Sequence, residues 1–158
     1  MKLKDRVTIV TGAGKGIGKG IATVFSREGA RVVIADWDEQ AGKKAAEEIR
    51  RSGGDALFAK CDVSNEKQVK AMILATIAKY GRINVLVNNA AIGVYKTVLD
   101  TTSEEWDRCL AVNLKGVFLC SKYAIPHIKA AGGGAIVNIA SVHSYQNVGG
   151  TAPYAASK

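Results

Sequence analysis

The sequence predicts an α/β fold in which a doubly wound parallel sheet carries helices on both faces. Short apolar runs rich in Val, Ile and Ala, typical of buried strands, alternate along the chain with longer helical patterns. The first run passes into the first helix through a turn that contains four glycines, as parallel α/β sheets often do. The chain has no internal repeat, low-complexity tract or linker, so we expect residues 1–158 to form a single domain.

Each expected strand is an apolar run that follows or precedes a helical pattern. In chain order the runs are RVTIVTG (6–12), ARVVIAD (30–36), DALFAKCD (55–62), INVLVNNA (83–90) and AIVNIAS (135–141). This alternation of strand and helix implies a parallel sheet, because each connection must cross over one of its faces.

The helical patterns between these runs have identifiable ends. Gly53 and Gly81 close the second and third patterns, as glycines after a helix commonly do. Thr102, with Glu105 three residues later, fits a capping box that starts the fourth. The expected helices cover residues 16–28, 38–51, 64–80, 104–113 and about 114–131, with a last short helix from Pro153 to the end of the chain.

Composition excludes several classes of protein. The formal net charge is +8, but basic and acidic residues are interspersed, as in KKAAEEIRR, which is typical of a solvated helix face and not of a nucleic-acid-binding stripe. Cys61, Cys109 and Cys120 form no C-x-x-C pair and suggest neither a disulfide framework nor a metal site. No apolar stretch has the length of a signal peptide or a membrane span. We therefore expect a cytoplasmic protein without nucleic-acid or membrane partners.

The glycine-rich turn, VTIVTGAGKGIGKGIA, predicts a nucleotide site. Glycines at positions 12, 14, 16 and 18 permit positive φ angles and let a pyrophosphate approach the backbone, where the N-terminus of the helix favours its charge. A Walker A loop is excluded by spacing, because Ala13 stands where that motif requires glycine and Gly20 where it requires Ser or Thr. The turn therefore favours a dinucleotide.

Acidic and basic residues near this turn bear on the choice of cofactor. Asp36 ends the second strand, where a carboxylate can accept hydrogen bonds from the adenosine ribose and repel a 2′-phosphate. Asp38 is better placed to cap the following helix. Lys15 argues for NADP, since a cation in the loop could meet the extra phosphate. Because Asp36 should face the 2′ position directly, we expect NAD, with NADP the alternative.

At four places the chain resembles the short-chain dehydrogenase/reductase family, and the match extends over its whole length. The turn is similar to the family motif T-G-x-x-x-G-x-G, and CDVS (61–64) to the segment whose Asp meets the adenine ring. NNAA (88–91) resembles the family's N-N-A-G, with Ala91 in place of the glycine. The positions that match the family's catalytic tetrad are Asn113, Ser141, Tyr154 and Lys158. This resemblance implies a Rossmann-like sheet and an oxidoreductase.

The chemistry of hydride transfer agrees with that tetrad. Passing a hydride between a nicotinamide and a carbonyl or alcohol carbon requires a proton to move on or off the oxygen. A free phenol titrates near ~10, and a lysine ammonium one helical turn away favours the phenolate. We therefore expect Tyr154 to be the acid/base, Lys158 to tune it, and Ser141 to donate a hydrogen bond to the substrate oxygen. The resemblance implies that Asn113 bends its helix and holds a water that links Lys158 to solvent.

Other polar side chains near the tetrad have simpler interpretations. Ser144 and Tyr145 are hydroxyls of a loop after a strand, which commonly serve turn formation. His143 could touch substrate, but loop histidines are more often not catalytic, and His127 is assigned to structure. The residues expected to bind the cofactor are Gly12, Lys15, Gly16, Ile17, Gly18, Asp36, Asp62, Val63, Asn89, Ala90, Tyr154 and Lys158.

The expected activity is hydride transfer between a nicotinamide cofactor and a secondary alcohol or ketone, with sugar alcohols, acyl thioesters and steroids all possible substrates. The alternative is a dinucleotide-binding fragment or regulatory relative without turnover. Members of the family continue beyond the Tyr-Lys helix with a further strand and a segment over the substrate, so we expect residues 1–158 to lack the C-terminal strands. The resemblance implies a homodimer or homotetramer for the full-length enzyme.

Overall fold

The computed structural model describes residues 1–158, and its five strands form one parallel sheet in the order β3-β2-β1-β4-β5. Every pair of neighbouring strands runs in the same direction, and Ile9 lies beside Val33 of β2 and Leu86 of β4. The strands are β1 (Val7–Thr11), β2 (Arg31–Asp36), β3 (Asp55–Lys60), β4 (Val85–Asn88) and β5 (Ala135–Asn138). The predicted fold class is therefore confirmed.

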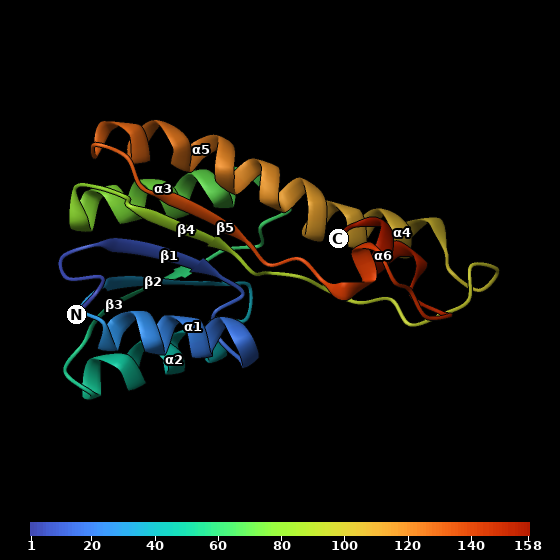
Figure 1. The fold of residues 1–158 in the computed structure, drawn as a ribbon, viewed down its shortest axis with the longest axis horizontal. Helices are drawn as coiled ribbons and strands as arrows, with labels where there is room; N and C mark the ends of the chain where they lie inside the picture. Colours follow the sequence, from blue (N-terminus) through green and yellow to red (C-terminus); the bar gives the residue numbers. More distant parts are fainter.

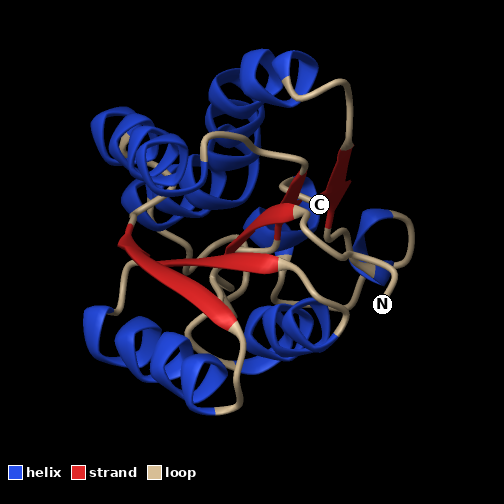
Figure 2. Ribbon diagram, turned by 90° about the vertical axis from the view of Figure 1, so that its left-hand side faces the viewer, coloured by secondary structure: helices blue, strands red, loops and turns tan.

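Helices cover both faces of this sheet, as Figure 2 shows. One layer packs α1 and α2 against β1, β2 and β3, and the opposite layer contains α3 and α5. The helices are α1 (Gly16–Arg27), α2 (Glu39–Arg51), α3 (Glu66–Tyr80), α4 (Ser103–Leu110), α5 (Gly116–Ala130) and α6 (Ala152–Ala156), with a π-helical turn at Ala111–Lys115 and a 3₁₀ turn at Val142–Ser144.

The core has two parts, one on each face of the sheet. Ile9 and Leu86 belong to the cluster under α3 and α5, whereas the next residues, Val10 and Val87, belong to the cluster under α1 and α2. All five residues of β1 are buried because both of its faces are covered. Burial on both faces explains why the strand sequences are continuous apolar runs without polar alternation.

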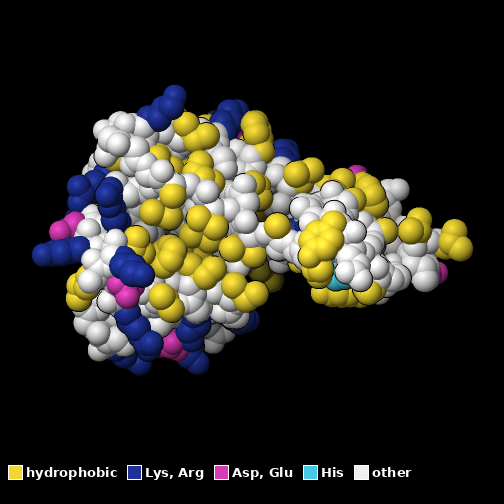
Figure 3. All heavy atoms as spheres, in the orientation of Figure 1, with side chains coloured by type: hydrophobic (Ala, Val, Ile, Leu, Met, Phe, Trp, Pro, Cys, Tyr) yellow, Lys and Arg dark blue, Asp and Glu magenta, His cyan; other side chains and the backbone are white.

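The carboxyl ends of the strands point toward α4 and α6, which project from one side of the α/β body (Figure 1). Figure 3 shows Lys and Arg side chains gathered at the opposite side of the body, with hydrophobic side chains across the middle of this face. No helix in the structure has both the length and the apolar character needed to cross a membrane.

Several boundaries differ from the sequence expectations. The last two strands stop at Asn88 and Asn138, because β4 and β5 pair only over four residues and the chain then leaves the sheet. The helices expected over 104–113 and 114–131 form one continuous run, since the π-turn joins α4 to α5. The last helix begins at Ala152, so Pro153 occupies its second position.

Candidate active site

The glycine turn between β1 and α1 has the geometry that a bound pyrophosphate needs. Gly16 has a φ of 54°, and beyond its chain neighbours and its own helix backbone no atom lies within 4 Å of the position a Cβ would take there. Gly18 packs beneath the turn, where a Cβ would lie 2.3 Å from the carbonyl oxygen of Gly12. No side chain caps the N-terminus of α1, so its first N–H groups remain available to an anion.

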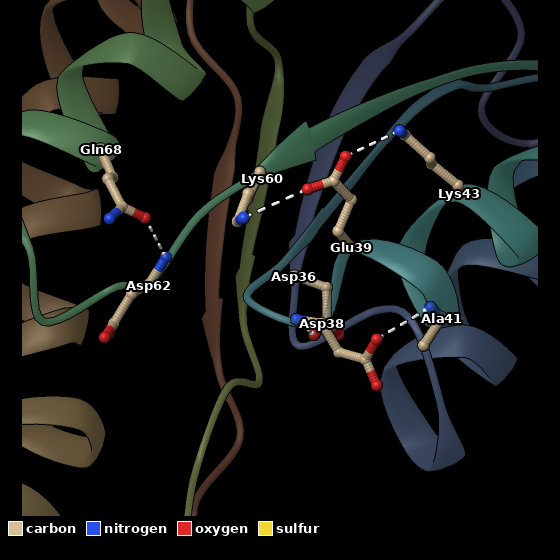
Figure 4. Close-up of polar contacts among 8 residues, drawn as sticks. All are labelled: Asp36, Asp38, Glu39, Ala41, Lys43, Lys60, Asp62 and Gln68. Carbon is tan, nitrogen blue, oxygen red and sulfur yellow. Dashed lines mark hydrogen bonds and ion pairs between the residues drawn. The ribbon is translucent and has the colours of Figure 1, made fainter.

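Asp36 and Asp38 lie at the turn after β2 and have different partners (Figure 4). The buried carboxylate of Asp36 accepts hydrogen bonds from the backbone N–H of Gly14 at 2.7 Å and of Asp38 at 2.9 Å. Asp38 caps α2 by accepting from the N–H of Ala41 at 3.0 Å, as the sequence predicted. The oxygens of Asp36 keep free lone pairs, so this carboxylate can still accept a bond from a ribose hydroxyl.

Lys15 does not stand free in the glycine turn. Its ammonium lies 2.7 Å from the carboxylate of Asp38, although its side chain is largely exposed. The hydrogen bond between them raises the pKa of Lys15 and lowers the pKa of Asp38. A 2′-phosphate near this turn would therefore meet a cation that already has a carboxylate partner.

A cleft of about 740 Å³ opens above the carboxyl ends of β1, β2, β3 and β4. Its walls include the glycine turn, the turn after β2, the segments that follow β3 and β4, and one side of α4. The lining residues are Gly12, Lys15, Gly16, Ile17, Asp36, Trp37, Asp38, Cys61, Asp62, Val63, Asn89, Ala90, Ala91, Ile92, Arg108 and Val112. Open α/β sheets bind ligands at this edge, and the volume is that of a typical ligand site.

Asp62 joins two walls of the cleft. Its carboxylate accepts hydrogen bonds from the hydroxyl of Ser64 at 2.7 Å and from the guanidinium of Arg108 at 2.8 Å. Partial burial would raise the pKa of Asp62, but the hydrogen bonds from Ser64 and Arg108 outweigh it and lower that pKa. Asp62 is therefore a carboxylate at neutral pH, and Gln68 accepts the hydrogen bond of its backbone N–H (Figure 4).

Thr11 and Asn89 fasten the glycine turn to the segment after β4. The amide nitrogen of Asn89 donates to the carbonyl oxygen of Thr11 at 2.9 Å and of Gly12 at 3.2 Å. The backbone N–H groups of Asn89 and Ala90 donate to the hydroxyl of Thr11 at 3.0 and 3.1 Å. Both donors of the Asn89 amide are thus used within the protein, so Asn89 shapes this wall of the cleft.

Asn113 lies in the π-turn between α4 and α5 and is buried. Its amide oxygen accepts from the backbone N–H of Ile92 at 2.8 Å, and its amide nitrogen donates to the Ile92 carbonyl and to the hydroxyl of Ser157, each at 2.9 Å. The helix is therefore deformed at Asn113, and its side chain connects the cleft segment after β4 to the chain that follows Tyr154. A role for Asn113 in holding a water stays a prediction.

Tyr154 and Lys158 come together as their spacing predicts. The ammonium of Lys158 lies 5.6 Å from the centre of the Tyr154 ring and donates to the carbonyl oxygen of Ile139 at 2.8 Å. Burial lowers the pKa of Lys158. The pairing does not need a continuous helix, because α6 ends at Ala156 and the hydrogen bond to Ile139 holds the lysine side chain.

Ser141 opens the 3₁₀ turn after β5. Its hydroxyl accepts from the backbone N–H of His143 at 3.3 Å. The ring of His143 meets the ring of Tyr154 edge to face, with centroids 5.8 Å apart. The hydroxyl of Ser144 donates to the carbonyl oxygen of Ser141 at 2.8 Å, which agrees with a role in turn formation. The segment that carries Ser141 therefore contacts the helix that carries Tyr154.

The residues that the sequence predicts to bind the cofactor fall into two groups in the structure. Nearly all the expected cofactor residues line the cleft, except Gly18, which packs beneath it, and Tyr154 and Lys158, which lie with α6. Several wall residues were not among the expected cofactor residues, and two of them, Trp37 and Arg108, have large aromatic or charged side chains. Trp37 is 71% exposed and directly follows Asp36, so a large aromatic side chain beside the acidic strand end was the available signal. Arg108 gave no such signal, since only the fold brings α4 to Asp62.

A parallel sheet, a glycine turn open to an anion and a carboxylate at the end of β2 define a dinucleotide-binding α/β protein. Comparison with known proteins identifies its family: the family described as short chain dehydrogenase matches residues 6–158, so the chain belongs to that family. The family is one of oxidoreductases that bind a nicotinamide cofactor, as expected from the resemblance in the sequence.

Individual relatives agree with this assignment. An uncharacterized oxidoreductase of Thermotoga maritima is 45% identical over 99% of this chain and 61% of its own length. A cyclopentanol dehydrogenase of a Comamonas species is 40% identical over 99% of this chain and 63% of its own length. A crystal structure of a metagenomic short-chain oxidoreductase in complex with NADP has a TM-score of 0.94 and 37% identity, covering all of this chain and 72% of that one. The chain thus spans less than two thirds of the length of these two curated relatives.

Proposed function

We propose that the complete protein is a nicotinamide-dependent dehydrogenase that interconverts a small secondary alcohol and the corresponding ketone. The observation that carries this proposal is the pairing of Tyr154 with Lys158, on a segment that contacts the turn carrying Ser141, in a fold whose glycine turn fits a pyrophosphate. The named activity of the Comamonas relative, oxidation of a cyclic secondary alcohol, supports the substrate class.

The cofactor would lie along the cleft with its pyrophosphate at the N-terminus of α1. The open space at Gly16 and the uncapped helix favour this placement. Asp36 would accept a hydrogen bond from the adenosine ribose, and Asp62 would lie at the adenine end. When bound, the nicotinamide would supply the acceptor or donor of the hydride.

The proton would move at the hydroxyl of Tyr154. In the direction of oxidation, its phenolate takes the proton of the alcohol while Ser141 donates a hydrogen bond to the same oxygen. The Lys158 ammonium lies beside the Tyr154 ring, and its hydrogen bond to the carbonyl oxygen of Ile139 holds the charge there. Asn113 secures the chain after Tyr154 through Ser157.

We further propose NAD as the preferred cofactor. A carboxylate at Asp36 favours a ribose hydroxyl and repels a 2′-phosphate, and Lys15 already pairs with Asp38. One finding favours NADP: the similar metagenomic oxidoreductase was crystallised with it. Steady-state kinetics with both cofactors decide between them, since a preference for NAD predicts a higher kcat/KM with NAD than with NADP.

The activity itself is tested with the complete protein, NAD and a panel of cyclic and open-chain secondary alcohols, by following the reduced nicotinamide. We expect secondary alcohols to be oxidised and primary alcohols of equal size to be poorer substrates. Tight cofactor binding without turnover of any alcohol or ketone would instead support the alternative of a regulatory dinucleotide-binding relative. Cytoplasmic location and a homodimeric or homotetrameric assembly stay predictions, and sedimentation measures the assembly.

A further inference from the structure

The side chain of His143 contacts the ring of Tyr154. The two rings are nearly perpendicular, at 82°, with 5.8 Å between their centres. Edge-to-face packing at this distance is a favoured geometry for aromatic pairs and restricts the plane of both rings. The contact joins the turn after β5, which also carries Ser141, to α6.

The imidazole of His143 is itself held in place. The Asn147 side-chain oxygen accepts from the backbone N–H of Val148 at 2.9 Å, and a backbone N–H can only donate, which identifies that atom as the oxygen. The same oxygen lies 3.1 Å from His143 Nδ1, so Nδ1 carries the proton and donates. The hydroxyl of Thr151, the residue before α6, also reaches this oxygen at 2.6 Å.

The helix that carries Tyr154 needs such support. With only five residues, α6 is far shorter than an isolated helix that is stable in water. Asn113 and Ile139 bind Ser157 and Lys158, which secures the backbone after the tyrosine. Neither bond fixes the plane of the phenol, and His143 is the planar side chain that packs against it.

We propose that His143 is a positioning residue whose ring, oriented by Asn147, holds the phenol of Tyr154 in the plane required for proton exchange with the substrate. This inference rests on the function proposed above. It differs from a direct role of His143 in proton transfer, because a phenyl ring of similar shape would retain the contact. His143 and Asn147 should then act through one mechanism.

Steady-state kinetics of the complete protein test whether His143 affects turnover. His143→Ala should lower kcat by about 3- to 10-fold, the value of one aromatic pair, and leave the KM for the cofactor unchanged. His143→Phe should recover most of the loss. Asn147→Ala should lower kcat in the same way, and the double variant should be no worse than His143→Ala, because residues that act as a unit are not additive. His127→Ala, in the chain's other histidine, is the control and should behave as wild type.

Nuclear magnetic resonance tests the contact without any turnover. In protein with labelled tyrosine rings, Tyr154→Phe assigns the signal of Tyr154. His143→Ala should shift that signal, because the neighbouring ring is lost, and His127→Ala should not. Asn147→Ala leaves His143 present but frees its ring, so it should broaden or shift the same signal even if His143→Ala folds poorly.

A Tyr154 signal that stays in place in both His143→Ala and Asn147→Ala would overturn the proposal. So would an unchanged kcat in His143→Ala, or a His143→Phe variant as slow as the alanine variant. A wild-type protein that oxidises no alcohol would refute the proposed function, and the resonance experiment would still decide whether His143 holds Tyr154.

Discussion

The carboxylate of Asp36 accepts two backbone hydrogen bonds, from Gly14 and Asp38, besides facing the cleft. The same side chain would therefore shape the turn and select the cofactor. A substitution at this residue should change both properties, and they can be measured separately.

Asp36→Ser should move cofactor preference toward NADP. The variant removes the charge that repels a 2′-phosphate, and Lys15 is close enough to the turn to meet the phosphate. The loss of an acceptor for one buried and one half-buried N–H group should also lower the free energy of unfolding by about 1–3 kcal/mol. Kinetics with both cofactors and urea unfolding measure the two effects. A wild-type protein that already prefers NADP would contradict the assignment of Asp36.

Tyr154→Phe removes only the hydroxyl and keeps the ring that packs against His143 and Lys158. Cofactor affinity should therefore persist, while kcat falls by ~100-fold or more, the scale of a lost general acid/base. Calorimetric titration of the cofactor and steady-state kinetics measure the two quantities. Near-normal turnover in this variant would show that another group exchanges the proton, with Tyr145, the nearest other phenol in the sequence, as the candidate.

At the scale of elements, local sequence predicted the strands, the helices and the capping box at Thr102, because each depends on neighbouring residues. A bend at Asn113 was expected only through the family resemblance, and its π-helical form was not predicted, since no local pattern distinguishes it from an α-helix. The bond between Arg108 and Asp62 could not be predicted, because it joins residues far apart in the sequence. The same holds for the ring of His143, which is oriented by Asn147 and packs on α6.

The turn after β2 supplies a spectroscopic test of the cleft. Trp37 lines the cleft and is 71% exposed, so the adenine of a bound cofactor can stack on its indole ring. Its fluorescence should change when NAD or NADH binds. Trp37→Ala should weaken cofactor binding by about 5- to 100-fold, the range for stacking of a base on an aromatic side chain. The Trp106→Phe variant leaves Trp37 as the only indole of these residues, and it should keep the full fluorescence change, whereas Trp37→Phe should lose it. An unchanged signal from Trp37 on saturation with cofactor would place the adenine elsewhere.

At the scale of the whole molecule, α4 and α6 project from one side of the α/β body (Figure 1), and side-chain contacts connect them to it. Asn113 connects the segment after β4 to the end of α6 through Ile92 and Ser157. The ion pair between Arg108 and Asp62 connects α4 to the chain after β3.

The ion pair at Asp62 should make the stability of the protein sensitive to acid. The pKa of the Asp62 carboxyl is lower in the folded protein than in the unfolded chain, where it is near ~3.9. The ion pair therefore stabilises the fold fully above pH ~3.9, and this stabilisation is lost as the pH falls through the folded pKa. Asp62→Asn should therefore be less stable than wild type at neutral pH, by about 1 kcal/mol or less because the pair is partly exposed. The difference should shrink as the pH falls below ~4. Urea unfolding at several pH values measures it.

Asp107→Asn, on the same helix but without an ion pair, is the matched control and should show no such convergence. A gap between wild type and Asp62→Asn that stays constant down to the acid limit would show that the carboxylate of Asp62 does not hold α4 through its charge.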